Sequence, residues 1–120
     1  TVPVGKGPYG VAVDPGTHTV YVINEFESTV SVIDGSTCTV TATVRIRNIS
    51  EGVAVDPGTH TVYVTSFLDG TVSVIDGSTH TGTATVRIRN ISEGVAVDPG
   101  THTVYVTNLG DDTVAVIEHR

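Results

Sequence analysis

The sequence predicts an all-β fold assembled from repeated sheets, and two observations carry this prediction. The first is a repeat: the stretch 52–65, GVAVDPGTHTVYVT, recurs unchanged at 94–107 and, with isoleucine in the last position, at 10–23, so the period is 42 residues. The second is composition, because abundant Val, Ile and Thr without Met or Trp favour pleated sheet over helix. A period of about 40 residues with several short strands per unit is typical of a β-propeller blade.

Each unit is expected to hold four antiparallel strands, which we name a to d in chain order. In the first unit, strand a ends before Pro15, since proline has no N–H to give to a sheet. The Pro15-Gly16 pair predicts a turn with a positive φ at the glycine. The four strands are predicted at 10–14, 20–24, 29–34 and 39–47.

The repeat also sets the phase of the strands. Residues 1–4, from Thr1 to Val4, match 43–46 and 85–88, which predicts a d strand ahead of the first full unit. The order is then d-abcd-abcd-abc, with repeats at about 1–42, 43–84 and 85–120 in one three-blade unit, 1–120. The last strand, 113–118, lacks a following d strand.

Strand b is apolar on both faces, with Val20 and Val22 on one side and Tyr21 and Ile23 on the other. A sheet with one face in water alternates apolar with polar residues, so these strands need cover on both sides. Blades packed face to face supply that cover. A single antiparallel sandwich is the alternative, although it would not require a fixed period.

Three blades are too few for a closed ring, because propellers have about four to eight. Two chains remove the mismatch if residues 1–4 of each complete the last blade of the other. We therefore expect a homodimer closed into a six-bladed ring with two-fold symmetry.

Charge and cysteine content exclude several classes of protein. The formal net charge is −7, from 13 acidic and 6 basic residues, which is the opposite of a nucleic-acid-binding surface. The sequence shows no apolar run of membrane-spanning length and no signal peptide. Cys38 is the single cysteine, so no disulfide forms within the chain, and we interpret it as an incidental surface residue.

The connections from strand d to a and from b to c are expected to share one mouth of the central channel. Tyr9, Glu51 and Glu93 occupy equivalent positions just before the innermost strands, and Glu25 lies on a b-to-c loop. These four are the candidate ligand-binding residues. Clustered carboxylates could hold Ca²⁺ or Mg²⁺, or raise one another's pKa and serve as acid or base. A solvated rim with no cofactor is the favoured interpretation.

No catalytic residue is assigned, because no Ser-His-Asp order, phosphate-binding glycine loop or cysteine cluster stands out. His18, His60 and His102 recur in every a-to-b turn. A shared transition-metal site is one interpretation, but successive blade tips should lie too far apart, so duplication is the simpler origin. Their role stays open.

The words VYVTN (104–108), VYVIN and VYVTS, the block VAVDPGTHT and the word TVSVID together resemble the YVTN-type β-propeller repeat. The resemblance covers essentially the whole chain. It implies a propeller, commonly seven-bladed, of bacterial or archaeal surface or exported proteins, and it implies no single activity. The segment 7–10, GPYG, is similar to a channel-mouth segment of streptogramin lyases, which are metal-dependent propeller enzymes; their mouth histidines are replaced here by Glu51 and Glu93.

Two functions follow as hypotheses. The first is a non-catalytic propeller scaffold that works by binding or self-assembly, either at an extracellular or cell-surface location or as an engineered repeat protein. The second is a metal-dependent enzyme of lyase or lactonase type at the channel mouth.

Overall fold

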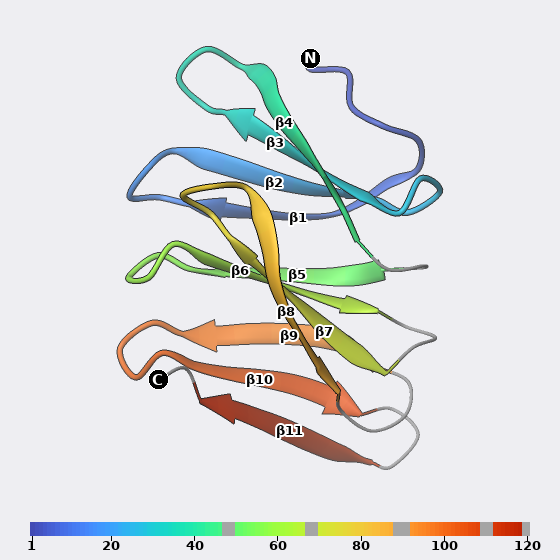
Figure 1. Ribbon diagram of the computed structural model, residues 1–120, viewed down its shortest axis with the longest axis vertical. Coiled ribbons are helices and arrows are strands. Elements are labelled where there is room, and N and C mark those ends of the chain that lie inside the picture. Colours follow the sequence, from blue (N-terminus) through green and yellow to red (C-terminus); the bar gives the residue numbers. More distant parts are fainter. Residues whose placement is uncertain (47–49, 67–69, 88–91, 109–111, 119–120) are drawn as a thin grey trace.

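The computed structural model describes residues 1–46, 50–66, 70–87, 92–108 and 112–118 (Figure 1). Every regular element in these ranges is a β-strand, as the composition predicts. None of the described segments is a helix long and apolar enough to cross a membrane.

The strands form three antiparallel sheets, and each sheet corresponds to one repeat. Within each sheet the strands pair in chain order, as in a propeller blade. The first sheet contains β1 (Pro8–Asp14), β2 (Thr19–Asn24), β3 (Thr29–Asp34) and β4 (Thr39–Arg45); the second contains β5 (Ser50–Asp56), β6 (Thr61–Ser66), β7 (Thr71–Asp76) and β8 (Thr81–Arg87); the third contains β9 (Ser92–Asp98), β10 (Thr103–Asn108) and β11 (Thr113–Glu118).

The predicted third strand of each end unit, 29–34 and 113–118, is confirmed to the residue. The predicted first strand begins too late, because β1 starts at Pro8 and carries a bulge between Pro8 and Val11. The same bulge recurs in β5 and β9. The extra residue lets the strand continue past the point where regular pairing would end.

Residues 1–4 form no strand within the chain. Their pairing with the last blade of a second chain therefore stays a prediction. The predicted end of the fourth strand, Arg47, lies outside the described residues, and β4 is described as far as Arg45.

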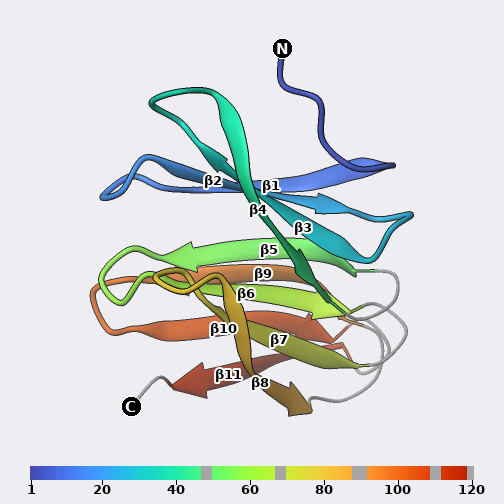
Figure 2. The same cartoon turned by 45° about the horizontal axis from the view of Figure 1, so that its top comes forward.

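The three sheets stack face to face along the long axis (Figures 1 and 2). The first strands of the blades, β1, β5 and β9, lie next to one another in that order. The apolar core has two parts, one in each space between sheets. Tyr21, Val30 and Val62 belong to the first part, and Tyr63 and Val104 belong to the second. Each sheet therefore covers its neighbour, as the two-sided apolar strands require.

The turn from β1 to β2 differs from the predicted one. The positive φ falls on His18 (56°) and not on Gly16, and the equivalent histidines adopt the same conformation at 54° and 55°. The flanking threonines stabilise this turn, since the Thr17 and Thr19 hydroxyls lie 2.8 Å apart in hydrogen-bond contact. Such a contact recurs in the turns at 37–39, 59–61, 79–81 and 101–103. In these five hairpin turns, the residue between the two threonines is the one with positive φ.

Candidate functional site

The four predicted mouth residues lie near the starts of β1, β5 and β9 and in the connection between β2 and β3. Tyr9 is the second residue of β1, and its side chain is 68 % exposed. Glu51 and Glu93 are the second residues of β5 and β9, so they lie inside these strands and not before them. Their side chains lie outside the described part of the structure. Glu25 is half-buried, and its backbone N–H donates to the carbonyl of Gly7 (2.9 Å).

A hollow of about 540 Å³ opens where the three first strands meet. Its polar side chains are Tyr9 and Thr107, and the rest of its lining is glycine and valine: Gly10, Val11, Gly52, Val53, Gly94 and Val95. The Thr107 hydroxyl is already engaged, because it accepts the N–H of the bulge residue Gly94 at 2.9 Å. Within the described ranges, no three His, Cys, Asp or Glu side chains gather closely enough to hold a metal ion.

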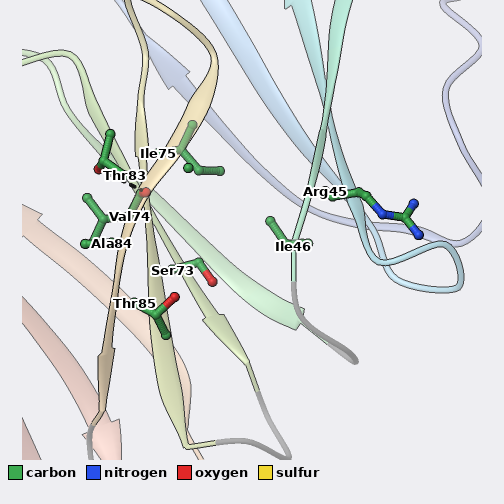
Figure 3. A pocket seen from close by; sticks show the side chains of 9 residues that line it. Arg45, Ile46, Ser73, Val74, Ile75, Thr83, Ala84 and Thr85 are labelled. Carbon is green, nitrogen blue, oxygen red and sulfur yellow. Dashed lines mark hydrogen bonds between the residues drawn. The ribbon is translucent and has the colours of Figure 1, made fainter.

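A second hollow, of about 450 Å³, lies between the first two blades at their outer strands (Figure 3). Ser73 and Thr85 place hydroxyls on its wall, while the Arg45 side chain points away from the labelled β7 and β8 residues. Gly82 contributes no side chain, and a Cβ built there would meet no atom within 4 Å. This hollow is an unfilled gap at the rim, with no charged group directed into it in the view of Figure 3.

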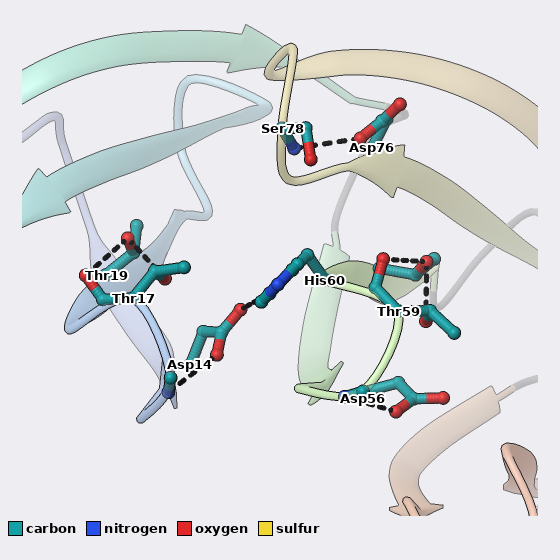
Figure 4. Close-up of polar contacts among 11 residues, drawn as sticks. Asp14, Thr17, Thr19, Asp56, Thr59, His60, Asp76 and Ser78 are labelled. Atoms are coloured by element: carbon teal, nitrogen blue, oxygen red, sulfur yellow. Dashed lines mark hydrogen bonds and ion pairs between the residues drawn. The ribbon is translucent and has the colours of Figure 1, made fainter.

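The repeated histidines join the blades. The His60 ring reaches from the second blade to the first, where its Nδ1–H donates to Asp14 Oδ2 at 2.7 Å (Figure 4). His102 makes the same bond to Asp56 at 2.8 Å. Each aspartate is at most 1 % exposed, whereas each histidine side chain is 40 % exposed. A buried carboxylate needs such a partner, because an unpaired buried charge is strongly unfavourable.

The second oxygen of each aspartate shapes its own turn. Asp14 Oδ1 accepts the N–H of Gly16 at 3.0 Å, and Asp56 Oδ1 accepts that of Gly58 at the same distance. The glycine is also required for space, since a Cβ on Gly58 would lie 2.8 Å from Cε1 of His102. One Asp-Pro-Gly motif therefore closes a hairpin and binds the histidine of the next blade.

Tyrosine accompanies each of these junctions. Tyr21 is 2 % exposed, and a Cβ on Gly77 of the next blade would lie 2.9 Å from its hydroxyl oxygen. Burial raises the pKa of Tyr21, and the nearby carboxylates of Asp14 and Asp76 raise this pKa further. Burial, together with Asp56, likewise raises the pKa of Tyr63. Both phenols stay neutral, so they suit the space between two sheets.

The sequence leaves the role of the three histidines open, and the structure assigns His60 and His102 to these junctions. A signal was present: aspartate and histidine partners are 46 residues apart at both junctions, one period plus four. A contact that repeats with the period must join neighbouring units.

The comparisons with known proteins concern the fold. No protein-family model matches the sequence, and no curated protein matches it. Among solved structures, the chain is similar to hydrazine synthase of Kuenenia stuttgartiensis, with a TM-score of 0.87 and 25 % identity over 98 % of this chain and 34 % of that one. It is also similar to apo AztD from Citrobacter koseri, with a TM-score of 0.68 and 18 % identity over 79 % of this chain and 28 % of that one.

Both similar structures are β-propeller proteins. The chain spans about a third of the length of each. Together with the three stacked antiparallel sheets, they define an all-β repeat protein of the propeller class.

Proposed function

We propose that this chain is a non-catalytic propeller scaffold of the YVTN-repeat type, which works through self-assembly and binding. Two copies form the homodimer, and six blades close the ring. The resemblance to surface proteins favours an extracellular or cell-surface location in a bacterium or archaeon. The scaffold needs no cofactor.

The observation that supports assembly is the pair of open apolar faces at the two ends of the stack. Val11 and Val13 of β1 are 66 % and 53 % exposed, and Val114 and Val116 of β11 are 55 % and 58 % exposed. The equivalent faces inside the stack are covered by a neighbouring blade. Large exposed apolar patches are typical of interaction surfaces.

Sedimentation equilibrium of the purified chain tests the proposal. We expect a dimer of about twice 12.5 kDa at micromolar concentration. Exchange of residues 1–4 has its own readout, because deletion of these residues should weaken the dimer and leave the three blades folded. A wild-type chain that remains monomeric at these concentrations would refute the proposal.

The second candidate function is a metal-dependent lyase or lactonase-like enzyme at the channel mouth. It is favoured by the hollow at the first strands, because its lining includes Gly52 and Gly94, the residues that follow Glu51 and Glu93 in the sequence. Metal analysis decides between the two functions: stoichiometric Ca²⁺ or Mg²⁺ that is lost in Glu51→Gln/Glu93→Gln supports the enzyme. Metal-free protein that still forms dimers supports the scaffold.

A further inference from the structure

Both junctions inside the chain are built from the same parts in the same direction. The earlier blade supplies a buried tyrosine and an aspartate, and the later blade supplies a histidine from its first turn. Tyr21 and Asp14 play these roles at the first junction, and Tyr63 and Asp56 at the second. Each blade therefore has two different faces. We call the side that carries the tyrosine and the aspartate the giving face, and the side that carries the histidine the receiving face.

The receiving face is defined at the first junction, where it is filled. Tyr21 packs in one apolar cluster with Val62 and the partly buried Val55 of the second blade. Its hydroxyl lies over Gly77, in the turn between β7 and β8. His60, from the turn before β6, completes this face with its bond to Asp14.

The first blade carries the same receiving face, and there it is empty. A hollow of about 410 Å³ is lined by Val13, His18, Val20, Gly35 and Ser36. These residues are one period of 42 before Val55, His60, Val62, Gly77 and Ser78 of the second blade. His18 is exposed, and no described residue forms a hydrogen bond with its ring.

The third blade carries the matching giving face. Tyr105 is 42 % exposed, whereas Tyr21 and Tyr63 in the equivalent positions are each 2 % exposed. Asp98 makes the same turn contact as Asp14 and Asp56, since its Oδ1 accepts the N–H of Gly100 at 3.0 Å. Within the described part of the chain, Oδ2 of Asp98 has no partner.

We propose that a second copy of this chain docks head to tail, with its Tyr105 in the hollow of the first blade and its Asp98 bonded to His18. The inference deepens the proposed self-assembly and rests on it. The partner is a second copy because its third blade carries the aspartate and tyrosine that both internal junctions use. Two such contacts, related by a two-fold axis, place all six blades in one direction around a ring.

Charge exchange between the two positions tests this contact. In Asp98→Lys, the introduced lysine faces His18 at both junctions of the homodimer, and in His18→Glu, the introduced glutamate faces Asp98 at both. Each variant alone should raise the dissociation constant at least about tenfold, because truncating or reversing one partner of a close ion pair has such effects. An equimolar mixture should restore near wild-type affinity, since one junction of the mixed dimer pairs the introduced lysine with the introduced glutamate and the other keeps the native aspartate and histidine.

Asp112→Lys is the matched control, because it makes the same charge change in the loop between β10 and β11 and should leave the dissociation constant unchanged. Circular dichroism of each dilute variant confirms that the blades are folded. If the mixture associates no better than its components, or if both variants associate like the wild type, the head-to-tail contact is wrong.

Tyr105→Ala gives a second readout that involves no charge. We expect it to weaken the dimer at least about tenfold, as loss of a central aromatic anchor does. A wild-type monomer would overturn the proposed assembly, whereas a wild-type dimer that tolerates Tyr105→Ala would overturn only this contact.

Discussion

At the scale of single residues, the aspartate at the end of each first strand joins local and long-range structure. Its two oxygens serve different partners, as Asp56 shows: one accepts the N–H of Gly58, and the other accepts the His102 ring N–H. A carboxylate suits this role because it accepts several hydrogen bonds at once. The bond to the next blade is possible because the turn uses only Oδ1 of Asp56 and leaves Oδ2 free to accept the His102 N–H.

Gly58→Ala tests how closely the junction is packed. The new Cβ would displace the His102 ring from Asp56, so we expect a loss of about 1 to 3 kcal/mol in the free energy of unfolding. Gly16→Ala is the matched control, since the His60 ring lies 3.7 Å from the Cβ position there. Urea unfolding measures both variants. Equal losses in the two would show that the ring contact does not limit the turn.

Tyr21 predicts a loss of stability at alkaline pH. Its pKa in the folded chain is above the ordinary value of 10.0, because of burial and the charges of Asp14 and Asp76. Above pH 10 the unfolded state therefore binds fewer protons than the folded state, and stability falls as the pH rises. Tyr21→Phe should flatten this fall above pH 10. An unchanged alkaline slope in the variant, measured by urea unfolding, would exclude Tyr21 as the cause.

Residue-level features were the least predictable from the sequence. Pro-Gly pairs suggest a positive φ at the glycine, yet here the threonine pair around His18 holds the histidine in that conformation. At the second junction the glycine has another role, because a Cβ on Gly58 would lie 2.8 Å from the His102 ring of the next blade. The local Asp-Pro-Gly motif does not reveal that Asp14 binds a histidine 46 residues away in the sequence.

At the scale of strands and sheets, the sequence is informative because each blade is formed by strands that follow one another in the chain. Strand β3 was predicted to the residue, since turn residues bound it at both ends. The start of β1 differs from the prediction, because the sequence indicates a strand from Gly10 and β1 begins at Pro8. A bulge absorbs that irregularity and carries Tyr9 into the strand.

Gly82 in β8 stands where the equivalent strand of the first blade has Val40. Glycine in a strand is unfavourable because of its freedom in the unfolded chain, and the surrounding hollow leaves room for a side chain. Gly82→Val should therefore raise the free energy of unfolding by about 0.5 to 1 kcal/mol.

Gly77→Ala in the same hairpin is the opposite control, since its Cβ would collide with the backbone oxygen of His60. Thermal unfolding of the two variants should move the midpoint in opposite directions. A lower midpoint for Gly82→Val would mean that the gap at the rim is not free space.

At the scale of the whole molecule, stability and assembly are linked. The end faces of the stack are apolar, and the aspartate–histidine contact that repeats between blades indicates which faces fit together. The period and two-sided apolar strands allowed the blades to be predicted, but the direction of the contact required the structure. It depends on which face Tyr21 takes, and that follows from packing in three dimensions.

A tandem protein tests this link between sequence period and closure. Three periods of 42 residues make 126, six more than this chain, so two copies joined by a six-residue segment copied from residues 79–84 keep the repeat in phase. The segment supplies the missing start of a fourth strand, and residues 1–4 of the second copy supply its end. All six blades then belong to one chain.

We expect the tandem protein to sediment as a monomer of about 25 kDa, twice the 12.5 kDa of one chain, with a melting temperature that does not change with concentration. The wild-type chain should melt at higher temperature as its concentration rises, because a dimer is stabilised by mass action. Tyr105→Ala placed in both halves of the tandem protein should now lower stability without releasing subunits, since the junctions are covalently tied. A tandem protein that forms larger rings or filaments would show that the rotation between blades does not close at six.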